Sequence, residues 1–336
     1  MHFDELSDTM DHMLQDGKGI LAADESNGTI GKRFDTIGVE NNENNRRDYR
    51  LLLATTADLE NYINGVILFE ETFQNKDQNG TPIAQLFTEK GILPGIKVDK
   101  GLTLLANTDE EKVTQGLDGL SERLLHYKEL GAKFAKWRNV YSISEFTPSL
   151  TAIRAGAEVL ARYAATCQSI GIVPIVEPEV LMDGDHTIER CAEACEMVLH
   201  ELFCSLFVHQ VELEHIILKP SMVTSGKNTK PFSSPEEVAA YTLSVFRTNV
   251  PAAVPTINFL SGGQTPQQAT ANLNAINSQG YQPWSLSFSY GRALQEDCLR
   301  AWGGKASNVE AAQAALLKRA QLNGQACFGE YNSDME

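Results

Sequence analysis

A lysine directly followed by a proline ends one short aliphatic run of this chain, in the segment HIILKPSM. Lys219 comes after Ile216, Ile217 and Leu218, a pattern typical of a buried strand, so its ammonium group would lie at a strand end. Burying that charge is costly unless it is paired or its pKa is lowered. A lysine with a lowered pKa is a nucleophile that can form a Schiff base with a carbonyl compound. A strand-end lysine is more commonly a solvated residue, so the rest of the chain must decide.

Charged side chains two residues apart occur in three other strand-like runs. The pairs are Lys97 and Asp99, Lys136 and Arg138, and Glu177 and Glu179. Because side chains alternate along a strand, both members of a pair lie on the same side of the sheet. Together with Lys219 and Asp24, they give four basic and four acidic side chains, which indicates a self-compensating ring. Such a ring could merely fill a barrel, or its cations could lower the pKa of Lys219 while a carboxylic acid such as Glu177 transfers protons.

Two further segments have the residues of an anion site. Ser261, Gly262 and Gly263 follow one strand-like run, and glycines let backbone N–H groups approach a phosphate. Gly291 and Arg292 follow the next strand-like run, which contains Ser289. A second negative group could be held on the opposite side by a set of polar and basic side chains. These are Ser26, Arg33, Lys97 and Arg138.

The elements that would position these residues alternate along the chain. Strand-like runs lie near residues 19–24, 65–70, 95–99, 134–138, 172–179, 216–219, 256–261 and 286–292. Helical patterns lie near residues 45–57, 116–130, 149–169, 186–208, 235–247, 266–277 and 308–323. Eight such units predict a single-domain (β/α)8 barrel over residues 1–336, with its active site at the carboxyl ends of the strands. The alternative, an open doubly wound sheet, normally has a glycine-rich phosphate loop after its first strand, and GxGxxG is absent there.

The ends of the chain are expected to add little to this barrel. An amphipathic helix is predicted over about residues 3–15, with a short polar tail over about 325–336. The start has acids where a signal peptide would have basic residues, and no apolar run approaches the length of a membrane span. Six cysteines are few for 336 residues and suit reduced thiols in a cytoplasmic protein. The net charge of −16 argues against nucleic-acid or acidic-membrane partners.

Eight longer motifs carry a family resemblance. They are ILAADES, GIKVDKG, GLDGLSERLLHYKELGAKFAKWR, IVPIVEPE, ILKPSMV, FLSGGQ, LNAIN and LSFSYGRALQ. Together they closely resemble class I fructose-1,6-bisphosphate aldolases, from Gly17 to about Tyr331. The resemblance implies reversible cleavage of fructose 1,6-bisphosphate to dihydroxyacetone phosphate and glyceraldehyde 3-phosphate, without metal or other cofactor, in glycolysis and gluconeogenesis. It also implies the same barrel, assembled as a homotetramer.

The resemblance also implies residue roles. Lys219 would form the Schiff base, Glu177 would exchange protons around it, and Asp24 would be the base at the carbon-4 hydroxyl. Lys136 would polarise the reacting oxygen, and Glu179 would orient the lysines. The carbon-1 phosphate segment matches Ser261, Gly262, Gly263, Ser289, Gly291 and Arg292. Residues matched to substrate binding, several of them around the carbon-6 phosphate, are Ser26, Thr29, Arg33, Arg46, Lys97 and Arg138.

Two positions depart from the family pattern. Animal members have serine where this chain has Thr29, which keeps the hydroxyl group. Their long tail ending in a catalytic tyrosine has no counterpart in the sequence, which stops at GEYNSDME, and Tyr331 lies too early for equivalence to be assumed. The sequence leaves open a preference between fructose 1,6-bisphosphate and fructose 1-phosphate.

Three alternative functions would make different demands on the sequence. A metal-dependent aldolase needs histidines at ligand spacing, and the seven histidines form no HxH or HExxH pattern. Another Schiff-base sugar-phosphate aldolase would share all of these residues. A non-catalytic sugar-phosphate-binding scaffold would have no need for the matched set Asp24, Lys136, Glu177 and Lys219.

Overall fold

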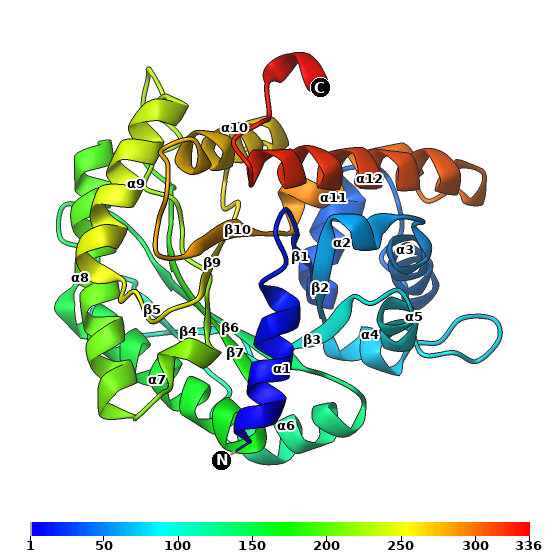
Figure 1. The fold of residues 1–336 in the computed structure, drawn as a ribbon, viewed down its shortest axis with the longest axis horizontal. Coiled ribbons are helices and arrows are strands. Elements are labelled where there is room, and N and C mark those ends of the chain that lie inside the picture. The colour runs from blue at the N-terminus through cyan, green and yellow to red at the C-terminus, as the bar shows by residue number, and fades with distance from the viewer. Residues whose placement is uncertain (1) are drawn as a thin grey trace.

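Eight parallel strands close into a barrel in the computed structural model, which describes residues 2–336 (Figure 1). The barrel strands are β1 (Gly19–Ala23), β2 (Ile63–Leu68), β3 (Leu93–Lys97), β6 (Phe134–Tyr141), β7 (Val173–Val180), β8 (Ile217–Leu218), β9 (Thr256–Phe259) and β10 (Ser285–Tyr290). Strands next to one another in sequence pair in the barrel, and β1 closes it by pairing with β10. Most strand residues are buried, because one side faces the barrel interior and the other faces the surrounding helices.

Helices connect the strands and form the outer layer (Figure 1). They are α2 (Asn27–Asp35), α3 (Glu43–Thr55), α4 (Glu70–Gln74), α5 (Ile83–Glu89), α6 (Leu120–Glu129), α7 (Leu150–Ile170), α8 (Ile188–Val208), α9 (Pro235–Asn249), α10 (Pro266–Asn277), α11 (Arg292–Trp302) and α12 (Val309–Ala326). Several begin where the sequence has a strong start signal. Ser234 and Thr265 each form a capping box, with proline at the first helical position.

The N-terminal helix closes the end of the barrel where the strands begin. Helix α1 (Phe3–Met13) lies across the barrel in Figure 1, and its Leu6, Met10 and Met13 pack against barrel residues such as Phe134 and Ile217. Gly95 of β3 makes room there for Phe134, because a Cβ atom at Gly95 would lie 2.1 Å from the Phe134 ring. The floor of the barrel is therefore solid, apolar packing.

The predicted barrel is confirmed, and all eight predicted strand runs overlap the strands observed. The helix predicted over about 3–15 was too long, because it ends at Met13 and the chain turns at Gly17, which has a positive φ. The tail was predicted over about 325–336, whereas α12 continues to Ala326 and a 3-10 turn follows at Ser333–Met335. Helices α2, α4, α5 and α11 and the hairpin β4 (Leu102–Leu104) and β5 (Lys112–Thr114) were not predicted.

Candidate active site

A cavity of about 850 Å³ opens at the carboxyl ends of the barrel strands. Fifteen of the seventeen predicted site residues lie in its wall. They are Asp24, Ser26, Thr29, Arg33, Lys97, Lys136, Arg138, Glu177, Glu179, Lys219, Ser261, Gly262, Ser289, Gly291 and Arg292. Each comes from a strand or from the segment just after one, so the closed barrel brings residues from distant parts of the chain to one end of the molecule.

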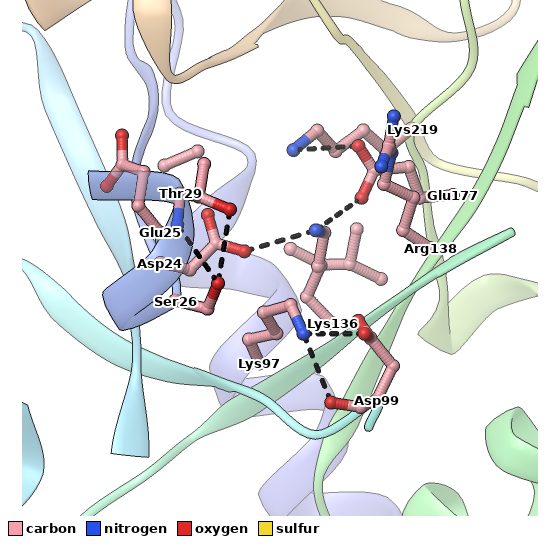
Figure 2. Close-up of polar contacts among 12 residues, drawn as sticks. Asp24, Glu25, Ser26, Thr29, Lys97, Asp99, Lys136, Arg138, Glu177 and Lys219 are labelled. Carbon is pink, nitrogen blue, oxygen red and sulfur yellow. Dashed lines mark hydrogen bonds and ion pairs between the residues drawn. The ribbon is translucent and has the colours of Figure 1, made fainter. Parts of the chain in front are cut away.

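Four ionisable side chains form a continuous row across the cavity, as Figure 2 shows. Nζ of Lys136 donates to Oδ2 of Asp24 at 3.1 Å and lies 2.9 Å from Oε2 of Glu177. The other carboxylate oxygen of Glu177, Oε1, lies 3.2 Å from Nζ of Lys219. Lys219 directly follows β8, and its backbone N–H donates to Val176 of β7. The row thus links β1, β6 and β7 with the end of β8.

Burial and neighbouring charges shift the pKa values along this row in different directions. For Lys219, burial lowers the pKa and the charge of Lys136 adds to this, against the opposing effect of Glu177. Burial alone would also lower the pKa of Lys136, but Asp24 and Glu177 raise it above its ordinary value. Lys136 is therefore held protonated, whereas the lowered pKa of Lys219 favours its neutral, nucleophilic amine.

The two carboxyl groups in the row are held as carboxylates. Burial alone would raise the pKa of Glu177, but the charges of Lys136, Lys219 and Arg138 lower it below the ordinary value. For Asp24, burial likewise acts to raise the pKa, and the charges of Lys136, Lys219 and Lys97 outweigh it. Both groups are ready to accept a proton, and Glu177 lies beside the amine of Lys219.

Two further ion pairs lie beside this row, and three of their four members, Lys97, Arg138 and Glu179, line the same cavity. Nζ of Lys97 lies 2.5 Å from Oδ1 of Asp99, and Nε of Arg138 donates to Oε2 of Glu179. Glu179 therefore pairs with Arg138, and the orientation of the lysines that the resemblance implies for Glu179 stays a prediction. All four predicted cations and all four predicted anions have an opposite charge within ion-pair distance, but these ion pairs form three groups and not one continuous ring.

The segments after β9 and in β10 form one polar corner. Nη2 of Arg292 donates to the backbone carbonyls of Gly262 at 3.0 Å and Gln264 at 3.4 Å, so the loop after β9 is tied to the start of α11. Ser261 is buried, and the buried Oγ of Ser289 has no hydrogen-bond partner among residues 2–336. An arginine, a glycine loop and a free hydroxyl group at one corner suit a phosphate.

Two predicted residues do not line the cavity. Arg46 of α3 pairs with Glu71 at 2.6 Å, and Gly263 packs against Met182 from behind the loop. The Glu71 carboxylate also accepts from Asn27 at 3.3 Å, so Arg46 supports the start of α2.

Sequence reasoning missed other residues that line the cavity. They include Glu25, Lys32, Gln295, Glu296 and Arg300. Glu25 follows Asp24 directly, in the predicted motif itself, and was therefore within reach of the sequence. The rest lie on α2 and α11, two helices that were not predicted.

Tyr331 lies outside the cavity wall. Its hydroxyl group donates to Glu336 at 2.9 Å, and its backbone N–H donates to Asn274 of α10. Burial and the neighbouring Glu336 carboxylate raise the pKa of Tyr331 to about 12. In this structure Tyr331 contacts none of the groups in the row.

Three further features concern disulfide bonds, metal ligands and membrane-spanning helices. All six cysteines are free thiols. Between residues 2 and 336, no three histidine, cysteine, aspartate or glutamate side chains gather closely enough to hold a metal ion. Over the same residues, no helix has both the length and the apolar character needed to cross a membrane.

A family model and named relatives both match this chain over nearly its whole length. The family model described as fructose-bisphosphate aldolase class-I matches residues 5–336. The chain is 54% identical to a protein named "Fructose-bisphosphate aldolase 4, cytosolic" from Arabidopsis thaliana, over 95% of this chain and 82% of the relative. It is 53% identical to fructose-bisphosphate aldolase C of Pan troglodytes, over 99% of this chain and 92% of the relative.

A solved structure is similar over nearly the same range. It is the fructose-bisphosphate aldolase of Plasmodium falciparum, solved in complex with TRAP and a small-molecule inhibitor. The two chains superpose with a TM-score of 0.97 at 49% sequence identity, covering 98% of this chain and 96% of the other.

Proposed function

This chain belongs to the class-I fructose-bisphosphate aldolase family, and from that premise we propose how its residues share the reaction. The enzyme cleaves fructose 1,6-bisphosphate reversibly to dihydroxyacetone phosphate and glyceraldehyde 3-phosphate through a lysine Schiff base, in glycolysis. The row of ionisable side chains from Asp24 to Lys219 is the observation on which the assignment of steps to side chains rests.

Lys219 is the nucleophile in this proposal. Its neutral amine adds to the carbon-2 carbonyl of the substrate, and the carbinolamine then loses water to give the iminium ion. As the amine adds, the carbonyl oxygen takes up one proton from solvent and becomes a hydroxyl group, while Glu177 takes the proton released from the amine. Glu177 then returns this second proton to the hydroxyl group, which leaves as water. The 3.2 Å separation of Glu177 Oε1 and Lys219 Nζ supports this role, as does the lowered pKa of Lys219.

Asp24 and Lys136 act on the carbon–carbon bond. Asp24 accepts the proton of the carbon-4 hydroxyl group, the bond between carbons 3 and 4 breaks, and its electron pair moves to the iminium to form the enamine. Lys136, protonated between Asp24 and Glu177, stabilises negative charge that develops on the reacting oxygen. Glu179 acts at one step removed, by fixing Arg138 beside this row.

The two phosphate groups lie on opposite sides of the row. Ser261, Gly262, Ser289, Gly291 and Arg292 form the proposed carbon-1 phosphate site, and Gly263 belongs to the loop behind it. Ser26, Thr29 and Lys97 form the second site, with Arg46 supporting it through Glu71 and Asn27. Arg33 lies beside Gly291 and Arg138 pairs with Glu179, so these two arginines are nearer to the carbon-1 phosphate site. The free hydroxyl group of Ser289 and the cationic walls support this division.

We further propose a homotetramer in the cytoplasm. Large apolar side chains lie on the surface of the single chain, among them Phe207 at 84% and Phe146 at 75% exposure, and contacts between subunits would cover such groups. One relative is described as cytosolic, which supports the location. Sedimentation of the purified protein tests the assembly, and a monomer at micromolar concentration would contradict it.

The test of the catalytic assignment is trapping of the Schiff base. Dihydroxyacetone phosphate and sodium borohydride should give one reduced adduct, which peptide mass spectrometry locates at Lys219, without added metal. Lys219→Met should abolish the adduct and lower kcat by about 10⁴-fold or more. The matched control is Lys227→Met, a change to a half-exposed lysine paired with Asp183, which should keep both adduct and activity. An adduct on another lysine, or none, would reject the assignment.

A further inference from the structure

Asp99 is a buried carboxylate beside the cavity to which the reaction assigns no step. Its side chain is 5% exposed, and it is not among the residues that line the cavity. Oδ1 lies 2.5 Å from Nζ of Lys97, and the same ammonium group donates to the backbone carbonyl of Asp99 at 3.1 Å, as Figure 2 shows. Oδ2 is buried and has no hydrogen-bond partner among residues 2–336. Keeping a carboxylate there is costly, which points to a use for its contact with Lys97.

The segment that carries Asp99 is held by three neighbouring elements. The N–H of Val98 donates to β6 at 3.1 Å, and its carbonyl accepts from Arg123 of α6 at 2.8 Å. The N–H of Lys100 donates at 2.8 Å to Gln115, which directly follows β5. The position of Asp99 is therefore set by the barrel, by α6 and by the hairpin of β4 and β5.

A turn at Gly101 fixes the carboxylate itself. Gly101 has a φ of 90°, which glycine adopts without strain. Its N–H donates to Oδ1 of Asp99 at 3.3 Å, and this is the oxygen that contacts Lys97. The backbone that leads into β4 thus fixes Oδ1, and Oδ1 in turn fixes the ammonium group of Lys97.

Lys97 lies across the barrel from the proposed carbon-1 phosphate site. It ends β3, and β3 is separated from β9 by β8, β7 and β6 on one side and by β10, β1 and β2 on the other. Ser261 and Gly262 follow β9, so they lie on the opposite side of the closed ring of strands. Lys97 lines the cavity and its side chain is 17% exposed. Within residues 2–336, two of its three N–H donors are used, both by Asp99, which leaves one for a ligand.

We propose that Asp99 is a positioning residue that holds the ammonium group of Lys97 toward the second phosphate of the substrate, and that it thereby sets the preference for a sugar bisphosphate over a sugar monophosphate. A lysine without such a partner would have to be ordered when the substrate binds, at a cost in affinity. The inference rests on the proposed function, because it takes Lys97 as a contact of the carbon-6 phosphate. Fructose 1-phosphate lacks that phosphate, so its cleavage measures the rest of the site.

Asp99 acts on the second phosphate in two ways of opposite sign. Its negative charge repels a phosphate, whereas its hydrogen bond holds the cation that attracts one. Because the charge of Asp99 is paired with Lys97 at 2.5 Å, we expect positioning to outweigh repulsion. The two effects can be separated, since asparagine keeps an acceptor oxygen without the charge and alanine removes both.

The experiment compares two substrates in the whole chain. The quantity measured is kcat/KM for fructose 1,6-bisphosphate divided by kcat/KM for fructose 1-phosphate. Lys97→Met should lower this ratio by about tenfold or more, as expected for loss of a charge-assisted contact. Asp99→Ala should lower it by about fivefold or more, and Asp99→Asn should restore most of this loss. The double variant of Lys97→Met and Asp99→Ala should match Lys97→Met alone, because Asp99 acts through Lys97.

Two readouts separate positioning from other effects of Asp99→Ala. Burial lowers the pKa of Lys136, whereas Asp24, Glu177 and Asp99 raise it, so loss of the Asp99 charge also acts on the row. That effect is common to both substrates and cancels in the ratio. Dihydroxyacetone phosphate should still be trapped at Lys219 in Asp99→Ala, since this ligand has no second phosphate.

The matched control is Asp183→Ala, which removes the carboxylate of an aspartate–lysine pair outside the cavity wall. It should leave the ratio unchanged. If Asp99→Ala does not fold, Asp99→Ser keeps an acceptor for the N–H of Gly101. The serine side chain is too short to hold Lys97, so this variant should lower the ratio in the same direction.

The outcomes are distinct. A lowered ratio in Lys97→Met with an unchanged or raised ratio in Asp99→Ala and Asp99→Ser would overturn the positioning role and leave the phosphate assignment intact. An unchanged ratio in Lys97→Met would remove the assigned phosphate contact, and this inference with it. The proposal is also rejected if Asp99→Asn is as impaired as Asp99→Ala, or if Asp99→Ala loses both substrates equally. Absence of the Lys219 adduct in the unmodified enzyme would instead reject the proposed function.

Discussion

Among single residues, Lys136 has the largest influence on its neighbours, because it lies between Asp24 and Glu177 and near Lys219. Its charge lowers the pKa of both carboxyl groups and of the Lys219 amine. A single cation thus keeps two bases ionised and assists in keeping one nucleophile neutral.

Lys136→Met should therefore change the pH profile as well as the rate. Without this charge, the pKa values of Lys219, Glu177 and Asp24 all rise. Less of the Lys219 amine is then neutral at a given pH, so borohydride trapping should require a higher pH. We expect kcat to fall by about 10²-fold or more, as for loss of an electrostatic stabiliser. The measurement is the yield of reduced adduct from about pH 6 to about pH 10.

The control is Lys128→Met. Lys128 pairs with Glu5 of α1, so this change should leave the pH profile of trapping unchanged. A trapping profile in Lys136→Met that coincides with that of the unmodified enzyme would contradict the role assigned to Lys136.

The sequence indicated the charged row because Lys136, Glu177 and Lys219 stand in aliphatic runs, where a charge needs a partner. It could not indicate which carboxylate each cation would meet, since that depends on how the strands are placed around the barrel. Glu179 pairs with Arg138, whose neighbour in the register is Glu177. Arg46 matches the family pattern, yet its side chain turns to Glu71, a partner on a short helix that no periodicity revealed.

Among the elements, α1 has a purely structural part. It fills the end of the barrel opposite the cavity, where Met10 and Met13 are each 3% exposed. None of its residues lines the cavity.

Met10→Ala should lower the free energy of unfolding by about 2–5 kcal/mol, because a cavity is left among atoms that cannot fully close around it. Activity of the folded enzyme at 25 °C should stay unchanged, since the row is at the other end of the barrel. Denaturant unfolding and steady-state kinetics on the same sample test this. The matched control is Met197→Ala, a change to a 40% exposed methionine of α8, which should alter stability by less than about 0.5 kcal/mol. A drop in kcat with Met10→Ala would show that the floor of the barrel does influence the site.

The long elements could be predicted because their periodicity is strong, as in α7, α8 and the eight strands. Helices α2, α4 and α5 have 9, 5 and 7 residues, too few turns for an apolar stripe to stand out. Helix α11 was missed for another reason. Its first turn is the segment GRALQ, which was interpreted as the end of a strand and a phosphate loop.

At the scale of the whole molecule, the buried carboxylates link stability to pH. In the folded protein, burial acts to raise the pKa values of Asp24, Glu25 and Glu177, but the basic partners outweigh burial and lower them. Folding therefore favours the ionised forms. Their contribution is complete above the ordinary values of 3.8 and 4.5 and is lost as the pH falls toward the lower folded values.

The thermal midpoint should accordingly be steady from about pH 7 to about pH 5.5 and fall steeply below about pH 4. Calorimetry or circular dichroism at constant ionic strength measures it. Glu177→Gln removes one of these groups, so its midpoint should fall less steeply with acid than that of the unmodified enzyme. Parallel curves would mean that Glu177 contributes nothing to the acid sensitivity.

The cavity combines residues from early and late parts of the chain, since Asp24 follows β1, Arg292 follows β10, and these two strands pair to close the barrel. During synthesis Asp24 is added early, whereas the last residues of the cavity that surrounds it, such as Arg292, are added only after β10. A polypeptide that ended between β9 and β10 would contain Lys219 and Glu177 but no closed barrel to bury them. Their charges would then be solvated like those of surface residues. Catalysis therefore requires a chain that extends through β10, because only then can the barrel close around these residues.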